Sequence, residues 1–252
     1  TLTEAGQRYR DSVAPLVEEL ARAEADARNL RQRPSGTLRL STSVNFGQRR
    51  VIPLLPGFRK RYPEIKLECL FSDTNLDLVA EGVDLALRLA PAVSGDLITA
   101  KLIDTRYRVM ASPDYLASSS PLETPVDLRR HRCVLFNLAG YRSRWLFRDP
   151  AGKTEEIPVD GDLILSPAGA VYEAAVAGMG PALLADWAAE SAILDGRLVD
   201  LFPDHEVTAT TFDTAVWMVY PSRNYLPAKV RVMIEFLRQN LRSAGYPALP
   251  GI

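Results

Sequence analysis

The sequence has 252 residues, of which 47% are hydrophobic and 24% charged, with 30 basic and 31 acidic side chains and a formal net charge of −1. This composition predicts a soluble protein with one large domain or two lobes, and its balanced charge carries no strong electrostatic signature for binding nucleic acid or anionic membrane. No run approaches the ~18 apolar residues of a membrane span. Cys69 and Cys133 lie in apolar runs and are expected to be buried free thiols, which fits a reducing cytoplasm.

The N-terminal stretch predicts a dimerisation helix. Apolar or small side chains recur alternately four and three residues apart, at Tyr9, Val13, Leu16, Leu20, Ala23, Ala27 and Leu30. This spacing is the a/d seam of a coiled coil, and so narrow a stripe favours pairing with one other helix. Pro15 lies off the seam, where it kinks the helix or, if Ser12 is the cap, occupies its first turn. The alternative is a helix packed on its own domain.

After Pro34-Ser35-Gly36, which reads as a linker, predicted strands alternate with predicted helices. Strands are expected at 37–43, 65–71, 83–89, 97–103, 106–112, 132–137, 145–149, 155–160, 162–166, 181–185, 197–201 and 214–221. Helices are expected at 46–64, 72–82, 167–178 and 226–241, the last with Val230, Ile234, Leu237 and Leu241 on one face. The alternation predicts an α/β protein with parallel sheets.

Enzyme chemistry leaves no recognisable pattern. The two histidines, His131 and His205, stand in no metal-ligand spacing, and the motifs of zinc sites, phosphate loops, dinucleotide folds and serine nucleophiles are absent. Asp73, at a strand-to-helix turn, reads as a cap. We therefore expect neither an enzyme nor a metal site nor a cofactor.

Polar side chains at the ends of predicted strands are better candidates for binding. In open α/β sheets, ligands collect beyond the carboxyl ends of the strands. The candidates are Thr42, Ser43, Asn45, Phe46, Asp73, Arg88, Phe136 and Ser166. An Arg that closes an apolar strand can bind an anionic ligand or pair with a structural acid. Ser43 and Asn45 as helix caps and Phe136 as a core residue are the alternatives.

An ordered set of short motifs is more specific than any single one. The set runs "LTEAG" (2–6), "SGTLRLS" (35–41), "VIPLLPGFRKRYPEIKLE" (51–68), "LVAEGVDLALR" (78–88), "RVMASPDYL" (108–116), "PVDLRRHRCVLF" (125–136), "GRLVDLF" (196–202) and "LPAKVRVMIEFL" (226–237). In this order, the motifs resemble the LysR-type bacterial transcriptional regulators from residue 2 to about residue 241.

The resemblance implies the end of a wing and a linker (dimerisation) helix over 1–33, with a winged helix-turn-helix that binds promoter DNA ahead of it. It implies an effector-binding domain over 37–241, like type 2 periplasmic binding proteins, and a tail at 242–252. Lobe I would hold 37–111 and 219–241, lobe II would hold 112–218, and the hinge would lie at Ala111, Ser112, Tyr220 and Pro221.

A small polar or anionic effector would bind between the lobes of a cytoplasmic homodimer or tetramer with no membrane contact. Closure of the cleft around this effector would alter the spacing of the DNA-binding domains. A solute receptor of the same fold, serving a transporter, is the alternative from another class.

Overall fold

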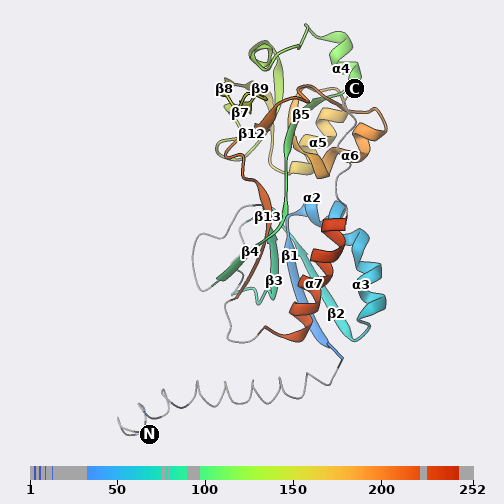
Figure 1. Ribbon diagram of the computed structural model, residues 1–252, viewed down its shortest axis with the longest axis vertical. Helices are drawn as coiled ribbons and strands as arrows, with labels where there is room; N and C mark the ends of the chain where they lie inside the picture. Colours follow the sequence, from blue (N-terminus) through green and yellow to red (C-terminus); the bar gives the residue numbers. More distant parts are fainter. Residues whose placement is uncertain are drawn as a thin grey trace.

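The computed structural model describes residues 33–74, 78, 80–89, 97–221 and 226–243, together with Thr3, Gly6, Tyr9 and Val13. These residues form two α/β lobes stacked end to end (Figure 1). The seam positions from Leu16 to Leu30 lie outside the described residues, so the dimerisation helix stays a prediction. Within the described ranges, no helix combines the length and apolar character that a membrane span requires.

Lobe I contains a five-stranded sheet in the order β2-β1-β3-β13-β4. Its strands are β1 (Gly36–Thr42), β2 (Ile65–Phe71), β3 (Leu85–Arg88), β4 (Leu97–Asp104) and β13 (Ala215–Pro221). β1 pairs in parallel with β2 and β3, whereas β13 runs antiparallel to β3 and β4. The helices are α2 (Val44–Phe46), the π-helix η1 (Gly47–Val51), η2 (Ile52–Leu54), α3 (Leu55–Arg61) and α7 (Ala228–Ser243).

The single helix predicted at 46–64 is therefore divided into four short pieces. Pro53 and Pro56 lie in the first turns of η2 and α3. Proline lacks a backbone N–H and cannot continue an α-helical hydrogen-bond ladder, so each proline begins a new element.

Lobe II contains an eight-stranded sheet in the order β8-β7-β12-β5-β10-β6-β9, with β11 paired to β5. Its strands are β5 (Tyr107–Ala111), β6 (Arg132–Phe136), β7 (Arg144–Arg148), β8 (Thr154–Pro158), β9 (Asp160–Leu165), β10 (Ala182–Ala185), β11 (Val199–Asp200) and β12 (Glu206–Thr208). Its helices are α4 (Pro113–Ser118), η3 (Pro125–Arg130), α5 (Ala168–Val176) and α6 (Asp186–Leu194). Only β9, β6 and β10 are parallel here, so the expectation of parallel sheets holds for part of each lobe.

The predicted hinge is wrong. Ala111 ends β5 and pairs with Val199 inside the lobe II sheet, and the Ser112 side chain accepts a hydrogen bond from the Tyr115 N–H at the start of α4. Tyr220 and Pro221 pair with β4 inside lobe I. A turn signal such as Ser112-Pro113 marks where a strand ends, but it does not reveal which sheet that strand joins.

The chain instead crosses between the lobes after β4 and again between β12 and β13. The first crossing is Thr105-Arg106, and the second spans 209–214. Two hydrogen bonds join the crossings: the Thr105 N–H donates to the Thr214 carbonyl at 2.9 Å, and the Thr214 hydroxyl donates to the Thr105 carbonyl at 2.7 Å. Lobe I therefore ends near residue 104 and resumes near residue 215.

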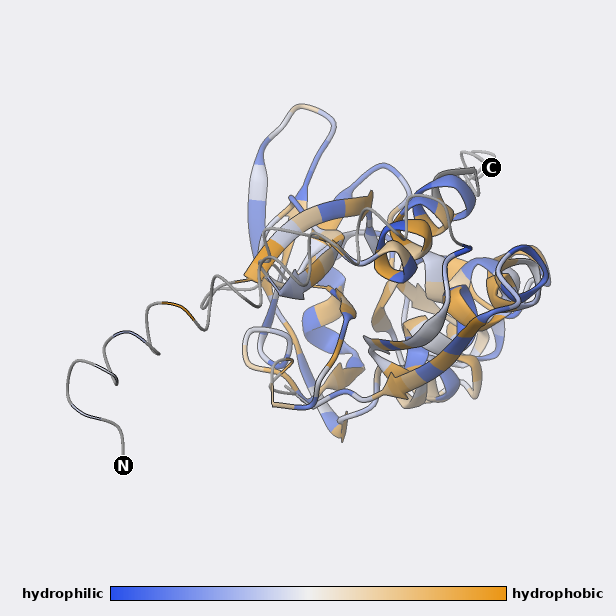
Figure 2. Cartoon of the chain, turned by 90° about the horizontal axis from the view of Figure 1, so that it is seen from below, coloured by the Kyte–Doolittle hydropathy of each residue, from blue (hydrophilic) through white to orange (hydrophobic). Residues whose placement is uncertain are grey.

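Helix α7 covers the lobe I sheet with its apolar face. Val230, Ile234, Leu237 and Leu241 are at most 6% exposed, which confirms the predicted helical face. Hydrophobic residues are concentrated in the strands and on the inner sides of the helices (Figure 2). Burial of this face is the main favourable contribution to the docking of α7.

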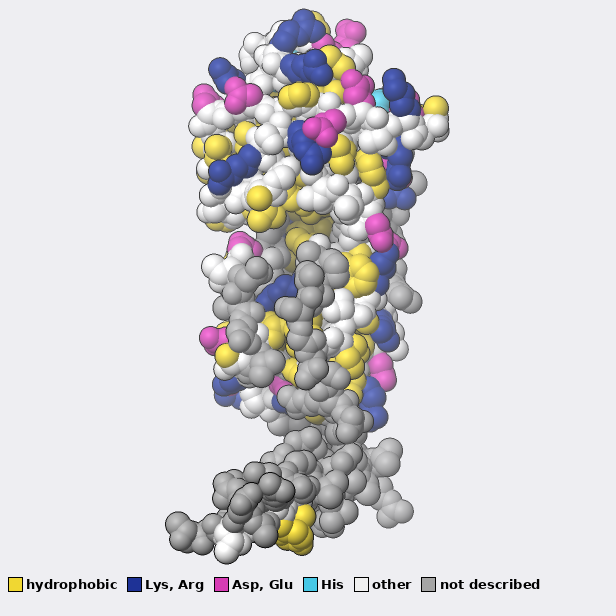
Figure 3. Space-filling view, turned by 90° about the vertical axis from the view of Figure 1, so that its left-hand side faces the viewer, with side chains coloured by type: hydrophobic (Ala, Val, Ile, Leu, Met, Phe, Trp, Pro, Cys, Tyr) yellow, Lys and Arg dark blue, Asp and Glu magenta, His cyan; other side chains and the backbone are white. Residues whose placement is uncertain are grey.

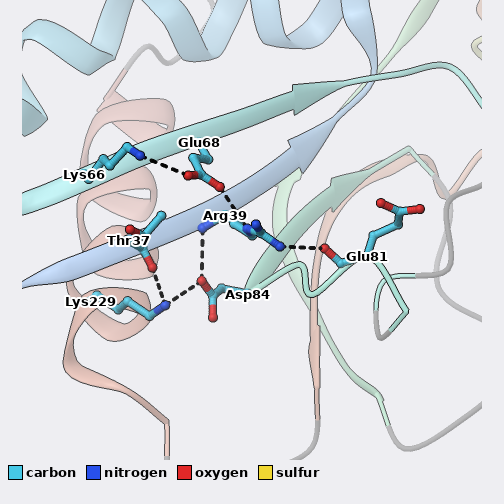
Figure 4. A network of polar contacts seen from close by, with 7 residues as sticks. All are labelled: Thr37, Arg39, Lys66, Glu68, Glu81, Asp84 and Lys229. Carbon is cyan, nitrogen blue, oxygen red and sulfur yellow. Dashed lines mark hydrogen bonds and ion pairs between the residues drawn. The ribbon is translucent and has the colours of Figure 1, made fainter.

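A polar network fixes the start of α7 to the start of β1 (Figure 4). The Lys229 ammonium donates to Asp84 Oδ2 at 2.6 Å and also to the Thr37 carbonyl. The same Asp84 oxygen accepts the Arg39 backbone N–H at 3.0 Å. The Lys229 and Asp84 side chains are only 22% and 12% exposed, so this ion pair is shielded from solvent.

We predict that Lys229→Met destabilises the protein by about 1–3 kcal/mol, because it leaves the shielded Asp84 carboxylate without its cation. The matched control is Lys66→Met in the same network, where the lysine is 72% exposed and contacts Glu68 at 3.2 Å. An exposed pair contributes roughly 0–1 kcal/mol. Urea unfolding measures both variants, and equal losses would contradict the assignment.

Candidate functional site

The topology brings the ends of many strands to one boundary. β4 runs directly into the first crossing, and β1 and β3 are parallel to it, so all three strands end against lobe II. In lobe II, β5 begins at the crossing, β10 is antiparallel to it, and β6 and β9 therefore end at the same boundary. In the space-filling view, the surface narrows and is hollowed between the two lobes (Figure 3). The predicted residues after these strands therefore meet in one region.

Thr42, at the end of β1, is a buried hydroxyl without a partner. Its residue is 1% exposed, and its Oγ1 makes no hydrogen bond to any part of the chain that the structure describes. An unsatisfied buried polar group costs about 1–3 kcal/mol. Buried hydroxyls normally have a hydrogen-bond partner, and a bound molecule could supply the partner that Thr42 lacks.

Arg88, at the end of β3, bonds to neutral acceptors among the described residues. Its guanidinium donates to Ser41 Oγ at 3.0 Å and to the Leu87 carbonyl at 3.4 Å. Across the described residues, no carboxylate lies within ion-pair distance of it. Burial lowers the pKa of this half-buried guanidinium. The alternative of a structural acid partner therefore finds no support in the described part of the chain.

Asn45 and Phe46 connect lobe I to lobe II. Asn45 is 6% exposed, and its Oδ1 accepts a hydrogen bond from Arg49 Nε at 3.0 Å. Phe46 packs edge-on against Trp187 of α6, with the ring centroids 5.0 Å apart. Phe46 is thus a core residue shared by both lobes, not an exposed contact for a ligand.

Two arginines of η1, which were not predicted from the sequence, contact lobe II next to the Phe46–Trp187 pair. The Arg49 guanidinium lies 4.1 Å from the ring centroid of Tyr172, and its Nη2 lies 3.8 Å from Glu173 on α5. Arg50 pairs with Glu190 of α6 at 3.5 Å. These partners are far apart in sequence, so no local pattern could have revealed them.

The remaining predicted residues have different roles. Asp73 Oδ1 accepts the Val44 N–H at 3.0 Å, so it caps α2 and not the helix predicted to follow it at 72–82. Ser43 occupies the N-cap position of α2, but its side chain makes no capping hydrogen bond. Ser166 is exposed before α5.

Phe136 begins a row of aromatic rings in lobe II. It packs edge-on against Tyr141 at 5.6 Å, and Tyr141 packs against Tyr107 at 6.1 Å. Tyr107 starts β5, and its hydroxyl accepts a hydrogen bond from Tyr141 at 3.4 Å. Lobe II therefore presents aromatic rings near strand ends, whereas lobe I presents hydroxyls and a guanidinium.

The described residues contain no candidate metal-binding site. Across the residues whose positions are described, no group of three His, Cys, Asp or Glu side chains is arranged to bind a metal ion. Burial raises the pKa of the Cys133 thiol to about 12, so this cysteine is a poor nucleophile.

Comparison with known proteins identifies the family. The LysR substrate binding domain matches residues 31–242. The HTH-type transcriptional regulator DmlR of Escherichia coli (strain K12) is 33% identical over 241 residues, which cover 95% of this chain and 76% of DmlR.

Solved structures of LysR-type regulators are also similar to this chain. CrgA, a LysR-type transcriptional regulator from Neisseria meningitidis, matches with a TM-score of 0.72 and 28% identity over 96% of this chain and 80% of CrgA. AphB, a Vibrio cholerae virulence activator, matches with a TM-score of 0.71 and 28% identity over 95% of this chain and 80% of AphB. These relatives are regulators and give no support to the solute-receptor alternative. The chain therefore belongs to the LysR-type transcriptional regulators, and residues 31–242 form their substrate-binding domain.

Proposed function

We propose that the boundary between the lobes binds a small polar or anionic effector and that its occupancy changes the relative position of the lobes. The observation that supports this most is Arg88, a half-buried cation without a carboxylate partner among the described residues. A buried charge is costly unless it is paired. An effector carboxylate would supply the missing pair, and the Thr42 hydroxyl would donate to the same molecule.

Asp186 is a partly buried carboxyl group on the lobe II side of the boundary. It follows β10, and its backbone N–H donates to the Arg106 carbonyl at the first crossing, at 2.9 Å. Burial raises the pKa of its carboxyl group, although the Trp187 and Arg106 backbone contacts and the nearby Arg108 and Arg106 charges oppose the rise. Burial therefore prevails over these contacts, and folding favours the protonated carboxyl group of Asp186.

The contacts across the boundary support a limited motion. Phe46 with Trp187, and Arg50 with Glu190, hold α2 and η1 against α6, and the Thr105–Thr214 hydrogen bonds join the two crossings. We propose that the lobes pivot about this packed side rather than separate. Such couplings are typically about 1–3 kcal/mol, and a nearly complete switch needs about 5.5 kcal/mol of differential binding.

The whole protein would transmit this change to DNA. We propose that the seam from Tyr9 to Leu30 pairs in a homodimer or tetramer, and that a winged helix-turn-helix joined to it binds promoter DNA. The regulators named above support this assignment by family. We also propose that the protein works in the cytoplasm and catalyses no reaction.

We predict that small carboxylates raise the melting temperature of the protein and that Arg88→Gln removes the rise. A ligand at 100 times its Kd adds about 2.7 kcal/mol, and losing a charged hydrogen bond costs about 1.5–3 kcal/mol. A thermal-shift screen followed by calorimetric titration measures the Kd, which we expect to weaken about 10- to 100-fold.

Arg129→Gln is the matched control, because Arg129 is exposed in lobe II and its removal changes the net charge equally. Thr42→Val tests the hydroxyl at almost constant volume and should weaken the same ligand. A carboxylate that binds Arg88→Gln as tightly as the unaltered protein would show that the effector does not contact this guanidinium.

We predict that Asp186→Asn raises stability at pH 7 and that the gain shrinks as pH falls. A raised folded-state pKa means that folding favours the protonated carboxyl, so its contribution is present at low pH and lost as pH rises through that pKa. Asparagine is neutral throughout. Unfolding measured from pH 7 down to pH 4, close to the ordinary carboxyl pKa of 3.8, follows the gain, with Asp195→Asn on the exposed Arg197 pair as the control. A gain that grows on acidification would contradict the assignment.

A further inference from the structure

A cluster of exposed cations lies on the outer side of lobe I, where α3 and α7 run side by side (Figure 1). The two helices meet through Phe58 and Phe236, whose ring centroids are 5.2 Å apart, and through Arg61 and Gln239, whose side chains are 3.5 Å apart. The surface around this contact, here called the basic face, consists of Arg59, Lys60, Arg61, Arg231 and Arg238, all exposed.

Among the described residues, the basic face lacks acid partners, a property it shares with a few scattered cations such as Arg129 and Arg142. Elsewhere in the described part of the chain, twelve Lys and Arg side chains reach a carboxylate within 4.0 Å. No such pair is found for the five cations of the basic face among the described residues. The acids that accompany them are Glu64 and Glu235, so the face has a formal charge of five minus two, or +3.

Helix dipoles explain only part of this arrangement. Arg59, Lys60 and Arg61 occupy the last turn of α3, where cations are favoured. Arg231 lies in the first turn of α7, where the helix dipole disfavours a cation, and no acidic residue occupies that turn. The dipole of α7 therefore does not account for the position of Arg231.

The basic face begins where the N-terminal segment enters lobe I. The Gly36 N–H at the start of β1 donates to the Glu64 carbonyl, just after α3, at 3.2 Å. The Lys229 ammonium, at the start of α7, bonds to the Thr37 carbonyl. Under the proposed function, the segment that enters here leads to the DNA-binding domain, so DNA is the polyanion that the whole protein brings close to this face.

We propose that the basic face binds the phosphate backbone of duplex DNA without reading its sequence. This proposal rests on the proposed function, because it assumes that the protein works on DNA. Arg231 and Arg238 are seven residues apart, about 10 Å along a helix at 1.5 Å per residue. Duplex DNA carries one charge per about 1.7 Å, so a row of this length faces several phosphates. The basic face adds a salt-sensitive contact, which would favour DNA that bends toward the substrate-binding domain.

The test uses this 252-residue chain and a fluorescein-labelled 30-base-pair duplex of arbitrary sequence. Fluorescence anisotropy at 20–150 mM salt should show weak binding that disappears as salt rises. The variant Arg59→Gln/Lys60→Gln/Arg61→Gln should bind at least about 10-fold more weakly, and its log–log salt slope should fall by about 0.9 for each phosphate that the variant no longer neutralises. Arg231→Gln/Arg238→Gln should have the same effect on a smaller scale.

The control is Arg130→Gln/Arg132→Gln/Arg144→Gln, which removes the same charge from paired arginines of lobe II. Equal weakening in this control, or no anisotropy change at 20 mM salt, would overturn the proposal. If the basic face instead receives an acidic surface of a second copy, the variants will change the sedimentation coefficient and leave DNA binding intact, which also overturns it. Failure here leaves the carboxylate-dependent thermal shift unaffected, so the effector site is judged separately.

Discussion

The arrangement of this domain depends on two chain crossings between two sheets. Because β4 continues into β5 through Thr105 and Arg106, and β12 returns through 209–214 to β13, both sheets share one boundary. The Thr105–Thr214 hydrogen bonds join the crossings there. Parallel pairing then brings the carboxyl ends of β1, β3, β6 and β9 to this boundary, which is where α/β folds gather ligands.

The boundary is asymmetric, and this asymmetry relates the fold to its proposed role. On the side of α2 and η1, aromatic and ionic contacts to α5 and α6 hold the two lobes together. At the ends of β1 and β3, the Thr42 hydroxyl has no hydrogen-bond partner and the Arg88 guanidinium has no carboxylate partner among the described residues. Under the proposed function, the first side limits the relative motion of the lobes, and the second provides hydrogen-bonding groups for the effector.

Much of this organisation was predictable, and the exceptions have physical causes. Val230, Ile234, Leu237 and Leu241 follow a helical period and are buried, because α7 depends on local amphipathicity. The hinge at Ala111 and Tyr220 was misplaced, since strand ends can be read from turn residues but sheet membership cannot. The contact of Phe46 with Trp187 is set by tertiary packing alone.

The central claim is that a ligand at the boundary shifts one lobe relative to the other. The most direct test is the distance between spin labels at Lys60→Cys in lobe I and Lys153→Cys in lobe II, in a Cys69→Ser background, by electron double resonance. With a carboxylate that raises the melting temperature, we predict a shifted and narrower distance distribution, and no shift when Arg88→Gln is added. An unchanged distribution in the presence of a saturating, bound carboxylate would contradict the account.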